Sequence, residues 1–342
     1  MIVSRSIRRA VAIVVVGAAC MPSGHDGRAP LNANDSTGYR VVHGWPALAE
    51  GTFFGGVSAV GVDSRGDVFI AERLDREWPK TDILDTTPMH TGPIVSLDGR
   101  TGAVRARWGA NILAFPHGLT IDSLDNVWIT DVALHQVFKF SHDGQLLLTV
   151  GTRAKPGNDA THFNRPTDVA IAPDGSFFVS DGYENTRIVK FAADGKFVSQ
   201  WGTKGTGEGQ FDLPHGITLN TDGLLYVSDR GNKRVQVFDQ SGRFVKQWSG
   251  AAFVSPNSIA VAPDGTLLLT DGGGRDSIPD RSGVVVLRAD GTRIGKIGRW
   301  GNQDGQFFDL HDVAVARDGS VYAVDVSGRR VQKFTGLPRS TK

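Results

Sequence analysis

Three histidines stand in closely similar sequence contexts, and they are the residues of this chain best suited to chemistry. His117 lies in FPHGL, His215 in LPHGI and His311 in LHDV. Three imidazole nitrogens that converge on one point form the ligand set of a catalytic Zn²⁺ site, in which the fourth coordination position stays open. Such a site requires elements that bring together residues far apart in the sequence.

Each histidine belongs to a repeated unit of the sequence. A unit contains an alternating strand, a turn that is often Asp-Gly, and a second alternating strand that ends on an acidic residue. A third and a fourth strand follow, as in RVQVF and FVSQWG. Four antiparallel strands repeated six times predict an all-β fold, a six-bladed β-propeller. The copies begin at Val57, Pro116, Pro166, Pro214, Pro256 and Leu310.

The last copy contains three strands of its own. We expect the segment Arg40–Pro46, RVVHGWP, to supply the fourth strand of that blade and so to close the ring. Closure of this kind also removes an exposed sheet edge.

One position of the repeat forms a ring around the predicted channel. The first strand of each blade lines the channel of a propeller, and histidines stand on alternate blades, about 120° apart. We therefore predict that the three imidazoles bind zinc; the alternative is three hydrogen-bonded channel histidines. The ring consists of Ser58, His117, Thr167, His215, Asn257 and His311.

The residues that follow the acidic positions face the same end of the channel. They include Arg73, Tyr183 and Arg230, because the start of the first strand and the end of the second meet at one rim. These side chains predict a cationic, hydrogen-bonding mouth above the histidines.

The histidine contexts, together with the runs DVALHQVFKF and DGYENTRIVKF, resemble the peptidyl-α-hydroxyglycine α-amidating lyases, which are NHL-type six-bladed propellers. The resemblance extends from Val57 to Phe334. It implies that His117, His215 and His311 bind zinc, that Tyr183 is the catalytic tyrosine, and that Arg73 and Arg230 are active-site arginines. It also implies a structural calcium ion held by the side chain of Asp312 and the backbone carbonyls of Val60 and Leu119.

The reaction implied by the resemblance is cleavage of the C–N bond of a peptide that ends in α-hydroxyglycine, giving an amide and glyoxylate. Tyr183 would act as the base, with its pKa lowered by zinc and Arg73, and Arg230 would hold the substrate carboxylate. Two other functions stay open. One is a non-catalytic NHL propeller that serves as a binding or scaffold module outside the cytoplasm, and the other is a propeller hydrolase of the calcium lactonase type.

Composition and the N-terminal segment bear on location and partners. The formal net charge of the 342-residue chain is +1, which gives no overall field toward nucleic acid. Residues 1–20 have the pattern of a signal peptide, and Cys20 suggests the lipoprotein type, with a plain cleaved signal as the alternative. We expect export to the periplasm or cell surface, membrane contact only through a lipidated Cys20, and a monomer. Residues 21–37 would be a tether, 38–336 the propeller and 337–342 a tail.

Overall fold

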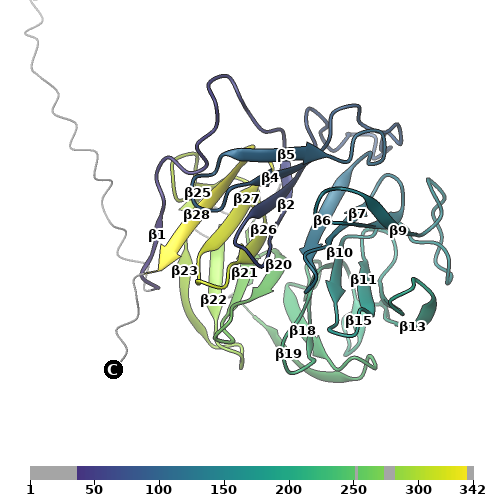
Figure 1. Ribbon diagram of the computed structural model, residues 1–342. Helices are drawn as coiled ribbons and strands as arrows, with labels where there is room; N and C mark the ends of the chain where they lie inside the picture. The colour runs from purple at the N-terminus through teal and green to yellow at the C-terminus, as the bar shows by residue number, and fades with distance from the viewer. Residues whose placement is uncertain (1–36, 251–252, 273–281, 337–342) are drawn as a thin grey trace, which may run out of the picture. The chain divides into compact units, whose positions relative to one another are not determined.

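The computed structural model describes residues 37–250, 253–272 and 282–336. Within these ranges it contains six four-stranded antiparallel sheets and no helix. The first strand of each sheet contacts the first strands of both neighbouring sheets, so the six inner strands form a closed ring around a channel (Figure 1). The fold is therefore the predicted six-bladed β-propeller.

The blades follow one another along the chain, each ordered from the channel outwards. Blade 1 comprises β2 (Val57–Val62), β3 (Val68–Glu72), β4 (Ile94–Leu97) and β5 (Val104–Trp108). Blade 2 comprises β6 (Pro116–Ile121), β7 (Val127–Asp131), β8 (Gln136–Phe140) and β9 (Leu146–Val150). Blade 3 comprises β10 (Asp168–Ile171), β11 (Phe177–Asp181), β12 (Arg187–Phe191) and β13 (Phe197–Trp201).

The second half of the ring repeats this order. Blade 4 comprises β16 (Pro214–Leu219), β17 (Leu225–Asp229), β18 (Arg234–Phe238) and β19 (Phe244–Ser249). Blade 5 comprises β20 (Pro256–Val261), β21 (Leu267–Asp271), β22 (Gly283–Leu287) and β23 (Arg293–Ile297). Blade 6 comprises β26 (Leu310–Val315), β27 (Val321–Asp325), β28 (Arg330–Gly336) and β1 (Tyr39–Val41). Two short parallel pairs are β14 (Thr203–Lys204) with β15 (Gln210–Phe211), and β24 (Arg299–Trp300) with β25 (Gln306–Phe307).

The N-terminal strand closes the ring as predicted, but it is shorter than predicted. Strand β1 pairs antiparallel with β28, and the N–H of Val42 extends the ladder with a 2.8 Å hydrogen bond to the carbonyl of Lys333. The predicted strand ran on to Pro46. The chain instead leaves the sheet because Trp45 turns into the interface between blades 6 and 1, where its buried ring lies 5.1 Å from that of Tyr322.

The hydrophobic core is divided among the interfaces between blades, with a separate apolar cluster in each of the six interfaces of the described residues. Tryptophans at the ends of outer strands contribute to this contact. The indole of Trp108 covers Gly144 in the β8–β9 turn of the next blade, where an added Cβ would lie 2.6 Å from the ring. Gly144 also has a φ of 87°, so glycine is required there for two reasons.

The acidic residue at the end of each second strand positions the channel residues. The carboxylate of Asp131 is fully buried and accepts hydrogen bonds from the backbone N–H groups of Ala114 and Phe115, at 2.7 and 2.9 Å. Asp325 binds the N–H groups of Phe308 and Asp309 in the same way, both at 2.8 Å. These bonds fix the segment that leads into each inner strand.

The predicted signal peptide, most of the tether and the tail lie outside the described residues, which begin at residue 37 and end at 336. The described strands belong to a compact unit of residues 33–342. Among the residues described, no helix is long and apolar enough to cross a membrane.

Candidate metal centre

The three histidines lie at the start of inner strands on alternate blades, His117 in β6, His215 in β16 and His311 in β26. Strand pairing shifts register at each of these positions. Such a bulge takes a residue out of the ladder and re-aims its side chain. The three rings point to one another with centroids 4.7 to 5.0 Å apart, and each ring offers a ligand nitrogen within 4.8 Å of the others.

Backbone carbonyls fix which nitrogen of each histidine is free. The Nδ1 atoms of His117, His215 and His311 lie 2.7, 3.0 and 2.6 Å from the carbonyl oxygens of Thr167, Asn257 and Ser58. These carbonyls belong to the ring residues of the next blade. Because a carbonyl only accepts, each Nδ1 carries the hydrogen and each Nε2 keeps its lone pair. Hydrogen bonds of this kind orient metal-ligating histidines.

Burial keeps the three imidazoles neutral. It lowers the pKa of His117 and His215 well below the usual value, and that of His311 to about 3, with Arg73 and Arg230 adding to the effect on His311. Neutral imidazole is the form that binds a metal ion. The donor set therefore fits a divalent cation such as Zn²⁺, with three nitrogen ligands and an open position.

Tyr183 lies against this donor set. It follows β11 by two residues, and its hydroxyl lies 2.9 Å from Nε2 of His117 and 3.3 Å from Nε2 of His215. Burial raises the pKa of the Tyr183 phenol, and the guanidinium groups of Arg230 and Arg73 only partly offset this increase. The sequence-based expectation named the effect of Arg73 correctly in direction but omitted the larger effect of burial.

The two predicted arginines also reach the site. Arg73 is 5% exposed, its guanidinium lies 4.7 Å from the ring centre of Phe115, and within the described residues its Nη2 has no hydrogen-bond partner. Arg230 donates from Nε to Oγ of Ser255 at 3.1 Å. A buried guanidinium with an unused donor suits an anionic ligand such as a carboxylate.

Sequence reasoning missed Asp309 at this mouth. Its half-buried carboxylate accepts a 3.2 Å hydrogen bond from Ser327 and acts electrostatically on Arg73, Arg230 and Tyr183. The repeat alignment contained a signal for it. In each copy of the repeat, one position lies two residues before the ring residue. Asp309 is the one acidic residue at this position, where the other copies have Gly56, Phe115, Arg165, Leu213 and Ser255.

The predicted calcium residues lie beyond the histidines in the channel. Asp312 accepts hydrogen bonds from the backbone N–H groups of Val60 and Val313 at 2.9 and 2.8 Å, and from the hydroxyl of Ser258. The structure thus brings Val60 beside Asp312. Leu119 lies in β6 and packs into the core between blades 1 and 2, and the role of its carbonyl stays a prediction.

A second, partly buried carboxylate in the channel, Asp168, was not predicted. It accepts hydrogen bonds from the N–H groups of Val169 and Ile217, at 2.8 and 3.0 Å. Burial and the nearby Asp312 raise the pKa of Asp168. Both acids line a cavity of about 10 Å³ that also touches the three histidines, and a cavity of this size has room for about one water-sized group. Carboxylate oxygens around such a cavity suit a hard cation.

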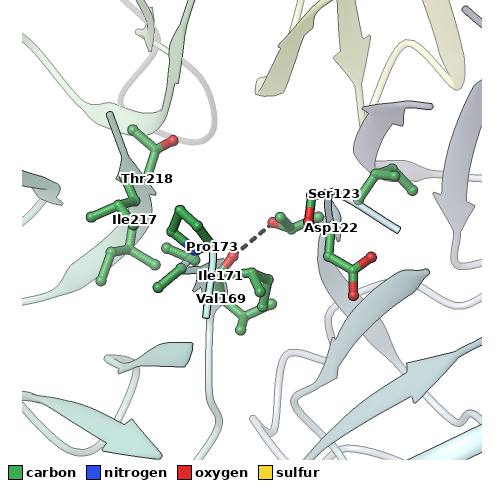
Figure 2. Close-up of a pocket in the computed structure, with 12 residues that line it drawn as sticks. Asp122, Ser123, Val169, Ile171, Pro173, Ile217 and Thr218 are labelled. Atoms are coloured by element: carbon green, nitrogen blue, oxygen red, sulfur yellow. Dashed lines mark hydrogen bonds between the residues drawn. The ribbon is translucent and has the colours of Figure 1, made fainter. Parts of the chain in front are cut away.

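A larger pocket, of about 270 Å³, lies at the far ends of β6, β10 and β16. Figure 2 shows its walls, with Asp122 and Ser123 on one side and Ile217 and Thr218 on the other. The carboxylate of Asp122 accepts hydrogen bonds from the side-chain amide of Asn126 and from the indole N–H of Trp128. This pocket contains none of the predicted site residues.

Comparison with known proteins finds relatives that are named as peptide-amidating enzymes. The NHL repeat family matches residues 113–140, 163–191 and 211–238. Peptidyl-alpha-hydroxyglycine alpha-amidating lyase 2 of Drosophila melanogaster is 35% identical over 309 residues, which cover 85% of this chain and 73% of the relative. Lyase 1 of the same organism is 34% identical, with 86% and 59% covered.

The chain belongs to the peptidyl-α-hydroxyglycine α-amidating lyase family. Other relatives, named as amidating monooxygenases, are longer, and the chain spans 30 to 35% of their length. Among solved structures, a gluconolactonase from Xanthomonas campestris matches with a TM-score of 0.59 at 15% identity, covering 91% of this chain and 98% of the other. That likeness concerns the propeller fold alone.

Proposed function

We propose that this propeller is a zinc-dependent lyase that cleaves a peptidyl-α-hydroxyglycine into a peptide amide and glyoxylate. The observation that carries the proposal is the convergence of three neutral Nε2 atoms with the Tyr183 hydroxyl, 2.9 Å from His117. Three histidine ligands with an acid–base group beside the open position are the parts that a metal-assisted elimination needs. The lyase names of the relatives support the same reaction class.

His117, His215 and His311 would hold the zinc ion. When bound, Zn²⁺ supplies Lewis-acid chemistry that makes a substrate hydroxyl more acidic. Burial raises the pKa of the Tyr183 phenol, which favours its protonated form. Tyr183 could act as a base only if its pKa were lowered. The positive charge of a zinc ion held by the three histidines would lower that pKa, because it favours the phenolate.

The bond changes balance without a co-reactant. The hydroxyl of R–CO–NH–CH(OH)–COO⁻ gives its proton to Tyr183, and its oxygen forms the C=O of glyoxylate while the C–N bond breaks. The amide nitrogen takes the electron pair of that bond and the proton that Tyr183 returns. Arg230 and Arg73 would bind the carboxylate, Arg73 through its Nη2, which has no hydrogen-bond partner in the described part of the chain.

Calcium in the channel is a further part of the proposal. Asp312 would be a ligand, with the carbonyls of Val60 and Leu119. Asp312 lies close enough to Asp168 for its charge to raise the pKa of Asp168. Two carboxylates this close favour a cation between them. The ion would be structural.

The direct test is release of glyoxylate from α-hydroxyhippurate by the purified chain, measured together with its metal content. We expect about one zinc per chain and zinc-dependent turnover. His215→Ala should lose most of the zinc and the activity, whereas His90→Ala, on the exposed surface, should keep both.

Three outcomes would contradict the proposal. Full zinc retention in all three single histidine variants would exclude a shared site. A zinc-free chain without turnover would favour a non-catalytic binding or scaffold module. Calcium-dependent hydrolysis of a lactone, with no glyoxylate formed, would favour the lactonase type.

Export is proposed on the sequence alone, because residues 1–36 lie outside the described part of the chain. We expect Cys20 to be the lipid-bearing first residue of a periplasmic or cell-surface protein. Mass spectrometry of the native N-terminus distinguishes this from an unlipidated, cleaved product.

A further inference from the structure

The connection between β3 and β4 of blade 1 is much longer than its counterparts. It comprises residues 73–93, whereas the same connection is 132–135 in blade 2 and 230–233 in blade 4. The fully described connections of blades 2, 3, 4 and 6 have no equivalent insertion, so propeller geometry alone does not explain it. Long connections that carry their own contacts are commonly functional.

This insertion lies against the connection 109–115 that leads from blade 1 into blade 2. Its backbone is tied there by hydrogen bonds between Met89 N–H and the carbonyl of Leu113, at 2.8 Å, and between Asn111 N–H and the carbonyl of Met89, at 2.7 Å. Arg76 donates to the carbonyl of Ala114 at 2.9 Å. The segment is therefore held in place along its length.

The insertion then reaches blade 3 through Asp82. Its carboxylate lies 2.8 Å from Nη1 of Arg165, and its carbonyl accepts from Nη2 of the same residue at 2.6 Å. Arg165 also contacts the carboxylate of Glu184 at 3.2 Å, and Glu184 directly follows Tyr183. The insertion of blade 1 and the tyrosine segment of blade 3 are thus joined by one arginine.

Trp78 contacts both Tyr183 and the Asp82–Arg165 pair. Its indole N–H donates to Asp82 at 2.8 Å, and the Arg165 guanidinium lies 5.7 Å from its ring centre. The ring of Trp78 packs against that of Tyr183 with centroids 4.9 Å apart, and edge-on to Phe115 at 5.7 Å. Tyr183 is therefore enclosed between this indole and the histidines.

We propose that residues 74–92 are a positioning element, in which Trp78 holds the Tyr183 phenol at the metal centre and the Asp82–Arg165 pair holds Trp78. Tyr183 lies on the short loop between β11 and β12. A contact from another segment is therefore needed to keep its hydroxyl within reach of the substrate proton. Small misplacements of a catalytic group are costly, on the order of 10²-fold in rate per ångström. The catalytic part of this inference rests on the proposed function of Tyr183.

The first experiment measures steady-state kinetics of variants with α-hydroxyhippurate at matched zinc content. Trp78→Ala should lower kcat about tenfold or more and leave KM within about twofold, because a residue that only positions Tyr183 acts on the chemical step and not on substrate binding. Trp78→Phe keeps an aromatic face and should recover most of the loss. Asp82→Asn should cause a smaller fall in kcat, whereas Asp239→Asn, which breaks the exposed Asp239–Arg243 pair, should cause none.

Two further readouts separate positioning from other roles. In a Tyr183→Phe background, Trp78→Ala should add no further loss of kcat, because the group that it positions is gone. Amide hydrogen exchange at residues 183–186 should become faster in Trp78→Ala and Asp82→Asn, whether or not the chain turns over an α-hydroxyglycine.

The outcomes are distinct. A rise in KM with unchanged kcat would overturn the inference and make Trp78 a substrate contact. Unchanged exchange and unchanged kcat in Trp78→Ala would also overturn it. If the wild-type chain releases no glyoxylate, the proposed function fails, and hydrogen exchange alone then decides whether the insertion holds Tyr183.

Discussion

The hydroxyl of Tyr183 and Nε2 of His117 form a 2.9 Å hydrogen bond that joins blade 3 to blade 2. Because Nδ1 of His117 donates to the Thr167 carbonyl, Nε2 accepts from the phenol with its single lone pair. That lone pair cannot bind a metal ion and the phenol hydrogen at the same time. Metal binding must therefore release the hydroxyl of Tyr183 from His117, which leaves it free to face a substrate.

Removing this hydroxyl tests its role. Tyr183→Phe should keep the fold and at least the wild-type zinc affinity, because the competing hydrogen bond is lost. If Tyr183 is the base, kcat should fall by ~10² or more. The measurement is glyoxylate release at matched zinc content. Near-wild-type kcat would show that the tyrosine only packs and would leave the base to be found elsewhere in the site.

Arg230 should act on the substrate carboxylate more than on the chemical step. Arg230→Lys keeps the positive charge but loses the planar fork and the Nε donor to Ser255. We expect KM to rise about tenfold, as for the loss of one charge-assisted hydrogen bond, with a smaller change in kcat. A fall in kcat at constant KM would instead assign Arg230 to the transition state.

Asp309 should weaken the binding of an anionic substrate. Its negative charge lies near both arginines, so Asp309→Asn should lower KM for a carboxylate substrate by roughly a few fold. A neutral α-hydroxyglycinamide analogue should show no such gain. Asp174→Asn, in the β10–β11 turn, is the matched control. Equal changes in KM for both substrates would exclude a charge effect.

The repeat made the fold and the histidines predictable from sequence. Propeller symmetry places equivalent positions of each copy in one ring, so the register of His117, His215 and His311 is enough to predict their convergence. The same register contained a signal for Asp168, which stands one residue after the ring in blade 3, as Asp312 does in blade 6. The histidine pattern does not indicate Asp168, because the ring residue of blade 3 is Thr167 and not a histidine.

Other features of the site lie outside what a repeat can predict. Trp78 belongs to an insertion with no counterpart in the fully described connections of blades 2, 3, 4 and 6, and its contact with Tyr183 depends on how that insertion folds. The end of β1 was predicted too late for a similar reason. The buried contact of Trp45 with Tyr322 takes the chain out of the sheet, and the strand pattern of residues 40–46 gives no sign of this contact.

Closure of the ring should contribute strongly to stability. A chain that begins at residue 37 keeps β1 and should melt near the full-length protein. One that begins at residue 47 loses the β1–β28 ladder and Trp45, and its melting temperature should fall by at least several degrees. Trp45→Ala in the longer chain separates the loss of packing from the loss of the strand. Equal melting temperatures for the two truncations would contradict closure by β1.

Stability should also depend on pH through His135, whose Nδ1 accepts a 3.0 Å hydrogen bond from the backbone N–H of Arg165. Burial, with a contribution from Arg165, lowers the pKa of His135 to about 4. In the unfolded chain its pKa is about 6.5, so below that pH the unfolded state binds a proton that the folded state does not. The free energy of unfolding should therefore fall as the pH drops from about 6.5 to about 4, and His135 should have no such effect above this range.

The substitution His135→Asn isolates this effect. His135 has a φ of 54°, a conformation that asparagine tolerates, and the asparagine oxygen can accept the same N–H. In chelated protein, denaturant unfolding at pH 7 and pH 4.5 should show a smaller loss of stability for this variant than for wild type, while the three channel histidines contribute equally to both chains. His90→Asn controls for the substitution at an exposed site. If His135→Asn loses as much stability as wild type between the two pH values, His135 does not titrate in the way that its burial implies.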